Sequence, residues 1–184
     1  MKRITLLLTA FATLLALTTP CLASAPENTL YMDLEFGRVE IEMRPDLAPA
    51  HCKRIKELVR TGFYDGVVFH RVIDGFMAQT GDPTGTGRGG SGQNIPAEFN
   101  SEPHVRGTVS MARASSPNSA DSQFFICFET VPSLDRNYTV WGKVTKGMEY
   151  VDMITKGDKW ANGMVKNPDR IVSMKVAADV QKAQ

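Results

Sequence analysis

VVFHRVIDGFMAQTGD, at Val67–Asp82, carries the strongest structural signal in the sequence, together with SQFFIC at Ser122–Cys127. Each stretch alternates as a β-strand does, but its polar residues do not suit an ordinary solvent-exposed face. Arg71 and Gln79 stand among aromatic and aliphatic residues, where an unpaired guanidinium costs free energy unless it binds something. A cation and an amide beside a concave apolar surface indicate a site that holds a peptide by one ring-shaped side chain. The alternative is a salt-bridged arginine at the rim of a β-sheet core.

Hydrophobic periodicity predicts a mainly β chain. Alternating segments predict strands at 29–35, 38–43, 67–73, 76–80, 97–99, 107–112, 124–128, 139–144 and 171–176. Helical spacing of apolar residues predicts one helix over 50–60, with Pro49 in its first turn, and a shorter helix over 148–155. Six glycines predict a loop over 81–93. About eight strands with two helices fit a closed, eight-stranded antiparallel β-barrel capped at its ends by the two α-helices.

The first 25 residues differ from the rest of the chain. Two basic residues precede an apolar run that is too short to span a membrane, and small residues follow it. This pattern predicts a signal peptide over residues 1–25, cleaved after Ala23 or Ala25; the alternative is a short buried N-terminal helix. Residues 26–184 have the length of one domain with a sizeable core.

Composition argues against several functional classes. The chain has 21 basic and 20 acidic residues. No basic run indicates a nucleic-acid partner, and no second apolar stretch indicates membrane association after signal removal. Cys52 and Cys127 remain beyond the signal peptide, and we expect both to be free thiols in the core. The absence of C-x-x-C and the spacing of the three histidines predict no metal site.

Gly85-x-Gly87-x-x-Gly90 has the form of a dinucleotide-binding motif. Such a site needs a strand before the glycines and a helix directly after them. Here Ser91–Pro96 continues as loop, so the sequence predicts no nucleotide and no other cofactor.

Several ordered blocks closely resemble the cyclophilin family of peptidyl-prolyl cis-trans isomerases. The blocks are FHRVIDGFMAQTGD, TGTGRGGSGQ, GTVSMARA, DSQFFIC, and LD followed by VWGKV between Leu134 and Val144. The similarity extends from about Thr29 to Val176. It implies a cyclophilin-like barrel and an isomerase that accelerates X-Pro isomerisation in folding or exported proteins. It also implies proline-containing polypeptides as partners, and a reaction that requires neither metal nor cofactor.

The resemblance assigns roles to individual residues. Arg71 matches the key catalytic arginine of the family, and Gln79 matches the glutamine that orients it and bonds the peptide backbone. His70, beside Arg71, is interpreted as structural, because isomerisation transfers no proton. The implied substrate-binding residues are Phe76, Met77, Phe125, Leu134 and Tyr138 at the proline pocket, and Ala112, Arg113, Ala114 and Gln123 in the groove for the residues before the proline.

Three departures from many eukaryotic members have consequences. Ser133 replaces a tryptophan that is important for binding cyclosporin, Tyr138 replaces a histidine, and Arg113 replaces an asparagine that contacts substrate mainly through its backbone. The resemblance therefore implies an active isomerase with weak cyclosporin affinity. This set of residues resembles bacterial members, and with the signal peptide it predicts a periplasmic location. We expect a monomer.

Two functions of other classes remain open from sequence alone. A non-catalytic module or chaperone would bind proline-containing segments in the same groove, and a scaffold subunit would use its outer surface. The intact Arg71 favours the enzyme, because a protein that only binds could lose the arginine.

Overall fold

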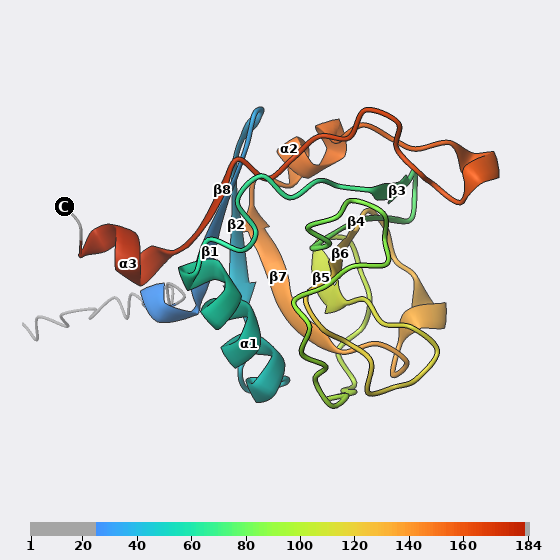
Figure 1. Ribbon diagram of the computed structural model, residues 1–184. Coiled ribbons are helices and arrows are strands. Elements are labelled where there is room, and N and C mark those ends of the chain that lie inside the picture. Colours follow the sequence, from blue (N-terminus) through green and yellow to red (C-terminus); the bar gives the residue numbers. More distant parts are fainter. Residues whose placement is uncertain (1–24, 183–184) are drawn as a thin grey trace, which may run out of the picture.

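Eight antiparallel strands form one curled sheet in the order β3-β4-β6-β5-β7-β2-β1-β8 (Figure 1). This computed structural model describes residues 25–182. The strands are β1 (Thr29–Leu34), β2 (Gly37–Met43), β3 (Arg71–Ile73), β4 (Met77–Thr80), β5 (Thr108–Met111), β6 (Phe124–Cys127), β7 (Val140–Lys146) and β8 (Ser173–Val176). The helices are α1 (Pro49–Arg60), α2 (Met148–Met153) and α3 (Ala177–Gln181), and the 3-10 turns are η1 (Pro26–Asn28), η2 (Pro132–Leu134) and η3 (Lys159–Ala161).

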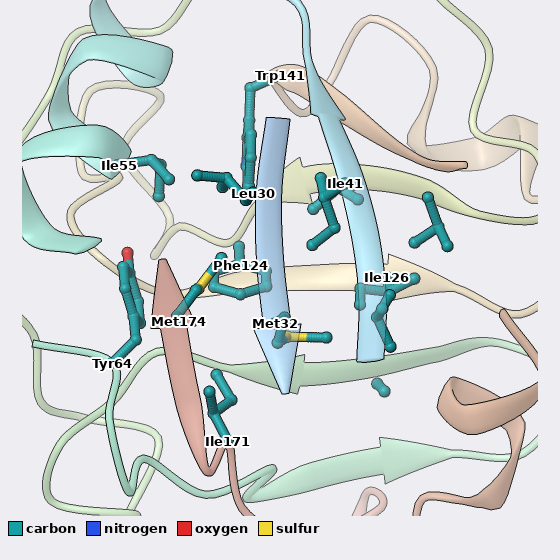
Figure 2. Close-up of a cluster of buried hydrophobic side chains, with 14 of the residues drawn as sticks. Leu30, Met32, Ile41, Ile55, Tyr64, Phe124, Ile126, Trp141, Ile171 and Met174 are labelled. Carbon is teal, nitrogen blue, oxygen red and sulfur yellow. The ribbon is translucent and has the colours of Figure 1, made fainter. Parts of the chain in front are cut away.

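One large apolar core fills the concave side of the sheet. In Figure 2, Leu30 and Met32 of β1, Ile41 of β2, Phe124 and Ile126 of β6, Trp141 of β7 and Met174 of β8 lie around it, with Ile55 of α1, Tyr64 and Ile171. All of these side chains are fully buried. In Figure 1, α1 lies toward the lower end of β1, β2 and β7 and α2 toward their upper end. The helices therefore cover the ends of the curled sheet, as the sequence predicts.

Helix α1 follows directly from its sequence pattern. Pro49 occupies the first turn, where its missing N–H group costs no hydrogen bond. The buried residues recur at helical spacing and include Cys52, Ile55, Leu58 and Val59. The predicted helix over 50–60 is therefore confirmed, and α2 is confirmed over all but the last two of its predicted residues. Within residues 25–182, no helix has both the length and the apolar character needed to cross a membrane.

Two strand predictions were wrong in part or in full. No strand forms at 97–99, because the backbone N–H groups of Ala97 and Glu98 donate to side chains, Asn118 Oδ1 and Thr139 Oγ1. Of the predicted strand over 67–73, only Arg71–Ile73 belongs to a regular strand. Alternation predicts extended backbone, but it does not say whether a neighbouring strand is present.

The regular hydrogen-bond ladder ends at β3 and β8 and does not close. The described chain is a curled half-barrel with three helices, not the two that we predicted. Irregular bonds link the segments that precede the two edge strands, from Gly66 N–H to Ile171 O at 2.7 Å and from Phe69 N–H to Asp169 O at 2.9 Å. Helix α3 has only five residues, too few to produce a helical pattern in the sequence.

The glycine-rich segment 81–93 is a loop, as predicted, and a buried carboxylate holds it in place. Asp82 has no exposed surface and accepts hydrogen bonds from the backbone N–H groups of Thr84, Gly87 and Gly89. A Cβ atom at Gly89 would lie 2.1 Å from Asp82 Oδ1, so only glycine allows this approach. Burial alone raises the pKa of Asp82, but the bonds from Thr84, Gly89 and Gly87 outweigh it and lower the pKa to about 2.

We predict that Asp82→Asn lowers the free energy of unfolding by about 2–3 kcal/mol at pH 7, because the amide cannot accept all of these bonds. The pKa of Asp82 is lower in the folded than in the unfolded chain, so its contribution is present above about pH 4 and is lost as the pH falls toward 2. Denaturant titrations of both proteins from pH 7 to pH 2 should show the difference between them shrinking at acid pH.

Asp46→Asn is the matched control for this experiment. The Asp46 side chain is 58% exposed and pairs with Arg44 at the surface. Its replacement should cost under about 1 kcal/mol. Equal losses in the two variants would show that Asp82 does not hold the glycine-rich loop.

Candidate active site

Strand β6 is buried on both faces. Strands β3 and β4 bury one face in the large core, and Arg71, Ile73 and Gln79 on their other face are half-buried, where the site forms. Val72, Ala78, Phe124 and Ile126 point into the large core. Because side chains alternate along a strand, their neighbours point to the opposite face. There Met77, Phe125 and Cys127 form a second, smaller cluster, against which Ile73, Phe76, Ala112, Leu134 and Tyr138 pack. This arrangement explains why FFIC is apolar at every position.

Strand register brings Arg71 and Gln79 together beside the small cluster. Arg71 lies opposite Gln79 in the β3–β4 pair, and Gln79 lies opposite Phe125 in the β4–β6 pair. One guanidinium nitrogen of Arg71, Nη1, donates to Gln79 Oε1 at 3.1 Å and lies 3.9 Å from Met77 Sδ. The amide and the guanidinium are therefore fixed relative to each other.

Asn162, just after η3, fixes the other side of the arginine. Arg71 Nε donates to the Asn162 backbone carbonyl at 3.1 Å, and Nη2 donates to Asn162 Oδ1 at 3.0 Å. Three of the five N–H groups of the guanidinium thus have oxygen acceptors within the described chain, which leaves two for a ligand. Burial lowers the pKa of Arg71, yet an arginine stays protonated at neutral pH.

Neutral groups surround Arg71, so the salt-bridge alternative is wrong. Within residues 25–182, no carboxylate lies within ion-pair distance of its guanidinium. Among residues 25–182, the oxygen acceptors bonded to this charge are those of Gln79 and Asn162. A half-buried cation in this state favours a ligand that offers a hydrogen-bond acceptor.

A hydrogen-bond chain connects Gln79 to the glycine-rich loop. Gln79 Nε2 donates to Gln123 Oε1 at 2.9 Å. Gln123 Nε2 donates in turn to the backbone carbonyls of Gly87 at 3.1 Å and Gly89 at 2.8 Å. Each amide thus has a defined orientation, and Gln79 presents its oxygen to the arginine.

A small apolar cavity of about 100 Å³ opens beside the arginine. Its lining includes nine of the predicted site residues: Arg71, Gln79, Phe76, Met77, Ala112, Arg113, Phe125, Leu134 and Tyr138. The other two, Ala114 and Gln123, line an adjoining groove that also contains Ala112 and Arg113. The structure therefore brings together every residue that the sequence singled out.

Aromatic packing holds the wall of this cavity. The rings of Phe125 and Tyr138 meet edge to face with centroids 5.7 Å apart, and His104 stacks behind Phe125 at 6.1 Å. The Arg113 guanidinium lies 4.8 Å from the centroid of Tyr138 and donates to the Asn137 carbonyl. Arg113 thus contributes its side chain to the wall, in addition to the backbone contact that the resemblance implies.

Asn162 and His104 were missed by sequence reasoning. The Asn162-Gly163 pair carried a signal, because asparagine before glycine marks a turn with positive φ, and Asn162 has φ of 54°. Its contact with Arg71 lies 91 residues away in sequence, and no local pattern reveals it. His104 bonds Asp135 and Ser110 behind the aromatic wall, which is a supporting position.

The two cysteines that we expected in the core lie there. Phe69 is fully buried in the large core, and Cys52 and Cys127 are free, buried thiols. Burial raises the pKa of each thiol to about 12, so neither is a nucleophile at neutral pH. His70 is buried beside the site, and burial lowers its pKa.

Known proteins are similar in sequence to this chain over most of its length. The family model described as cyclophilin type peptidyl-prolyl cis-trans isomerase/CLD matches residues 29–176. A probable peptidyl-prolyl cis-trans isomerase of Brucella suis is 53% identical over 171 residues, which cover 86% of this chain and 87% of that protein. Peptidyl-prolyl cis-trans isomerase B of Bacillus subtilis is 44% identical over 134 residues, which cover 71% of this chain and 93% of that protein.

Solved structures share the fold as well. A cyclophilin from Hirschia baltica has a TM-score of 0.75 and 31% identity, with 84% of this chain and 76% of that chain covered. A cyclophilin type isomerase of Cryptosporidium parvum, crystallised in the presence of the dipeptide Ala-Pro, has a TM-score of 0.74 and 31% identity, with 80% and 98% covered. Because the family model spans nearly all of the described residues and these relatives share the architecture, the chain belongs to the cyclophilin-type peptidyl-prolyl cis-trans isomerases.

Proposed function

We propose that this isomerase binds the proline of a client polypeptide in the small apolar cavity and accelerates rotation of the X-Pro bond with Arg71. The observation that carries the proposal is the state of the arginine. Its guanidinium stands at the mouth of the cavity, held by Gln79 and Asn162, with two N–H groups left for a ligand.

The physics of the reaction explains why such a site is sufficient. An X-Pro amide resists rotation with a barrier of about 18–20 kcal/mol, because the C–N bond has partial double-bond character. At the top of the barrier resonance is lost, and the proline nitrogen becomes a better hydrogen-bond acceptor. A donor that bonds this nitrogen more strongly than it bonds the planar amide lowers the barrier. Each factor of ten in rate requires only about 1.4 kcal/mol.

The residues around the cavity divide this task. Phe76, Met77, Phe125 and Leu134 hold the ring, and the wall at Tyr138 closes one side. Arg71 supplies the donor, and Gln79 both orients it and stands within reach of the peptide backbone. The groove with Ala112, Arg113, Ala114 and Gln123 receives the residues before the proline. No group needs to gain or lose a proton, so neutral buried side chains suit the reaction.

The clients and the location are part of the proposal. The pattern of residues 1–25 supports export, and cleavage after Ala23 or Ala25 would release the folded domain outside the cytoplasm. There it would assist the folding of periplasmic proteins as a monomer. The Cryptosporidium parvum relative was crystallised in the presence of the dipeptide Ala-Pro, which supports proline-containing peptides as ligands of this fold.

We predict that Arg71→Ala lowers kcat/KM for a short X-Pro peptide by about 10²–10³-fold, because it removes the donor to the twisted amide. Arg71→Lys should lower kcat/KM at least about tenfold, since an ammonium group cannot bond Gln79 and Asn162 and still offer paired N–H donors to the substrate. Exchange NMR measures the rate, and circular dichroism verifies that the fold persists.

Arg38→Ala provides the charge-matched control, because Arg38 pairs with Asp33 in the β1–β2 hairpin. It should leave kcat/KM unchanged. A wild-type domain that binds proline peptides without accelerating them would establish the non-catalytic binding module instead.

We predict that Asn162→Gly lowers kcat by about fivefold and leaves KM nearly unchanged. Glycine keeps the backbone carbonyl and tolerates the positive φ, so only the bond from Nη2 to Oδ1 is lost. The arginine then adopts more orientations, which affects the transition state more than binding. Asn167→Gly, at an exposed neighbouring position, is the control. A change confined to KM would show that Asn162 does not position Arg71.

We predict weak inhibition by cyclosporin, because Ser133 is exposed where many eukaryotic relatives carry tryptophan. Ser133→Trp should tighten the inhibition constant by about tenfold through added aromatic contact. Ser101→Trp, at another exposed position, should not change it. Tight binding by the wild-type protein in a titration would contradict this prediction.

A further inference from the structure

Two large apolar side chains lie exposed on one short loop beside Arg71. Trp160 is 87% exposed and Met164 is 63% exposed, which makes them the most exposed large hydrophobic residues among residues 25–182. Both belong to the segment Asp158–Met164, hereafter the 158–164 loop. In Figure 1 this loop, the orange-red turn after α2, projects from the body of the molecule. Exposed apolar residues gathered next to a binding site indicate a contact surface for a ligand.

The loop has a fixed shape, so the exposure of Trp160 is part of the folded structure. Asp158 accepts from the backbone N–H of Trp160 at 2.8 Å, and the Gly163 N–H donates to the Asp158 carbonyl at 2.8 Å. Two further bonds join the loop region to β3, from Val72 N–H to Gly163 O and from Gly157 N–H to Val72 O. An ordered surface of this kind binds a partner with little loss of conformational entropy.

The loop is continuous with the candidate active site. Asn162, which holds Arg71, is one of its residues. A cavity of about 780 Å³ lies between the loop and the glycine-rich segment, and its lining includes Arg71, Gln79, Asn162 and Met164. Arg71 and Gln79 also line the small apolar cavity. The two hollows therefore meet at the catalytic arginine.

A buried polar side chain also lines the larger cavity. His70 is 6% exposed, and both of its ring nitrogens are buried. Isomerisation itself gives His70 no task.

We propose that the 158–164 loop and the adjoining cavity form a subsite for the residues that follow the proline, with a preference for apolar or aromatic side chains. The inference rests on the proposed function, which places the proline beside Arg71 and the preceding residues in the groove at Ala112–Ala114. A bound chain continues past the proline, and the larger cavity is the hollow that remains next to Arg71. Trp160 and Met164 then cover the following side chains.

The test compares two peptides that differ only after the proline, Ala-Ala-Pro-Leu-Phe and Ala-Ala-Pro-Gly-Gly. Wild-type protein should favour the apolar peptide by about tenfold in kcat/KM. Trp160→Ser should reduce that preference to about twofold, because kcat/KM falls more for the apolar peptide than for the glycine peptide. Met153→Ser removes a side chain on α2 that is 56% exposed, and it should leave the preference intact. A Trp160→Ser protein that keeps the full preference overturns the inference.

A second readout does not depend on catalysis. The chain has two tryptophans, and Trp141 is fully buried, so acrylamide quenching of fluorescence reports on Trp160. Saturating Ala-Ala-Pro-Leu-Phe should reduce the quenching, and Ala-Ala-Pro-Gly-Gly should not. If the wild-type protein accelerates neither peptide, the proposed function fails, and protection of Trp160 still decides whether the subsite exists. Unchanged quenching with the apolar peptide bound overturns the subsite alone.

Discussion

The site depends on one constraint, a guanidinium held by neutral acceptors. Gln79 and Asn162 take three N–H groups of Arg71 without offering a charge. A carboxylate in either position would orient the arginine equally well, but it would neutralise the charge and occupy the donors that the substrate needs. The dipoles of Gln79 and Asn162 fix the orientation of the guanidinium, and its positive charge stays available to a ligand. The rest of the structure serves to place these two acceptors.

The placement of Gln79 follows from the sheet, and the placement of Asn162 follows from a loop. Gln79 lies opposite Arg71 in the register of β3 and β4, which the turn at Asp74-Gly75 sets. Asn162 reaches the same guanidinium because bonds to Val72 attach its loop to β3. The β3–β4 hairpin and a loop distant in sequence thus both hold the side chain of Arg71. The sheet provides a rigid base, and the loops complete the site around it.

This division explains what the sequence could predict. The hairpin register, the helix at Pro49–Arg60 and the shared face of Met77 and Gln79 all follow from periodicity within a few residues. The resemblance supplied the remaining site residues, each of which lies at the cavity or its groove. Neither periodicity nor the resemblance identified Asn162. Its contact with Arg71 spans 91 residues, and its turn signal does not indicate which residue it contacts. The sequence also did not predict the open ladder, since alternation over 67–73 and 171–176 indicates extended backbone but does not say whether β3 and β8 pair with each other.

The same division separates catalysis from specificity. The elements that we propose to act on the twisted amide, Arg71 with Gln79 and part of the ring pocket, lie on β3, β4 and β6, where packing against the large core restricts change. The surfaces that we propose for client residues beyond the proline lie on loops, one held by Asp82 and one by Asp158. A buried carboxylate within the glycine-rich segment stabilises its loop without contacting the ring pocket. Loop residues such as Trp160 can therefore vary, and alter which clients bind, without disturbing the bonds that hold the arginine.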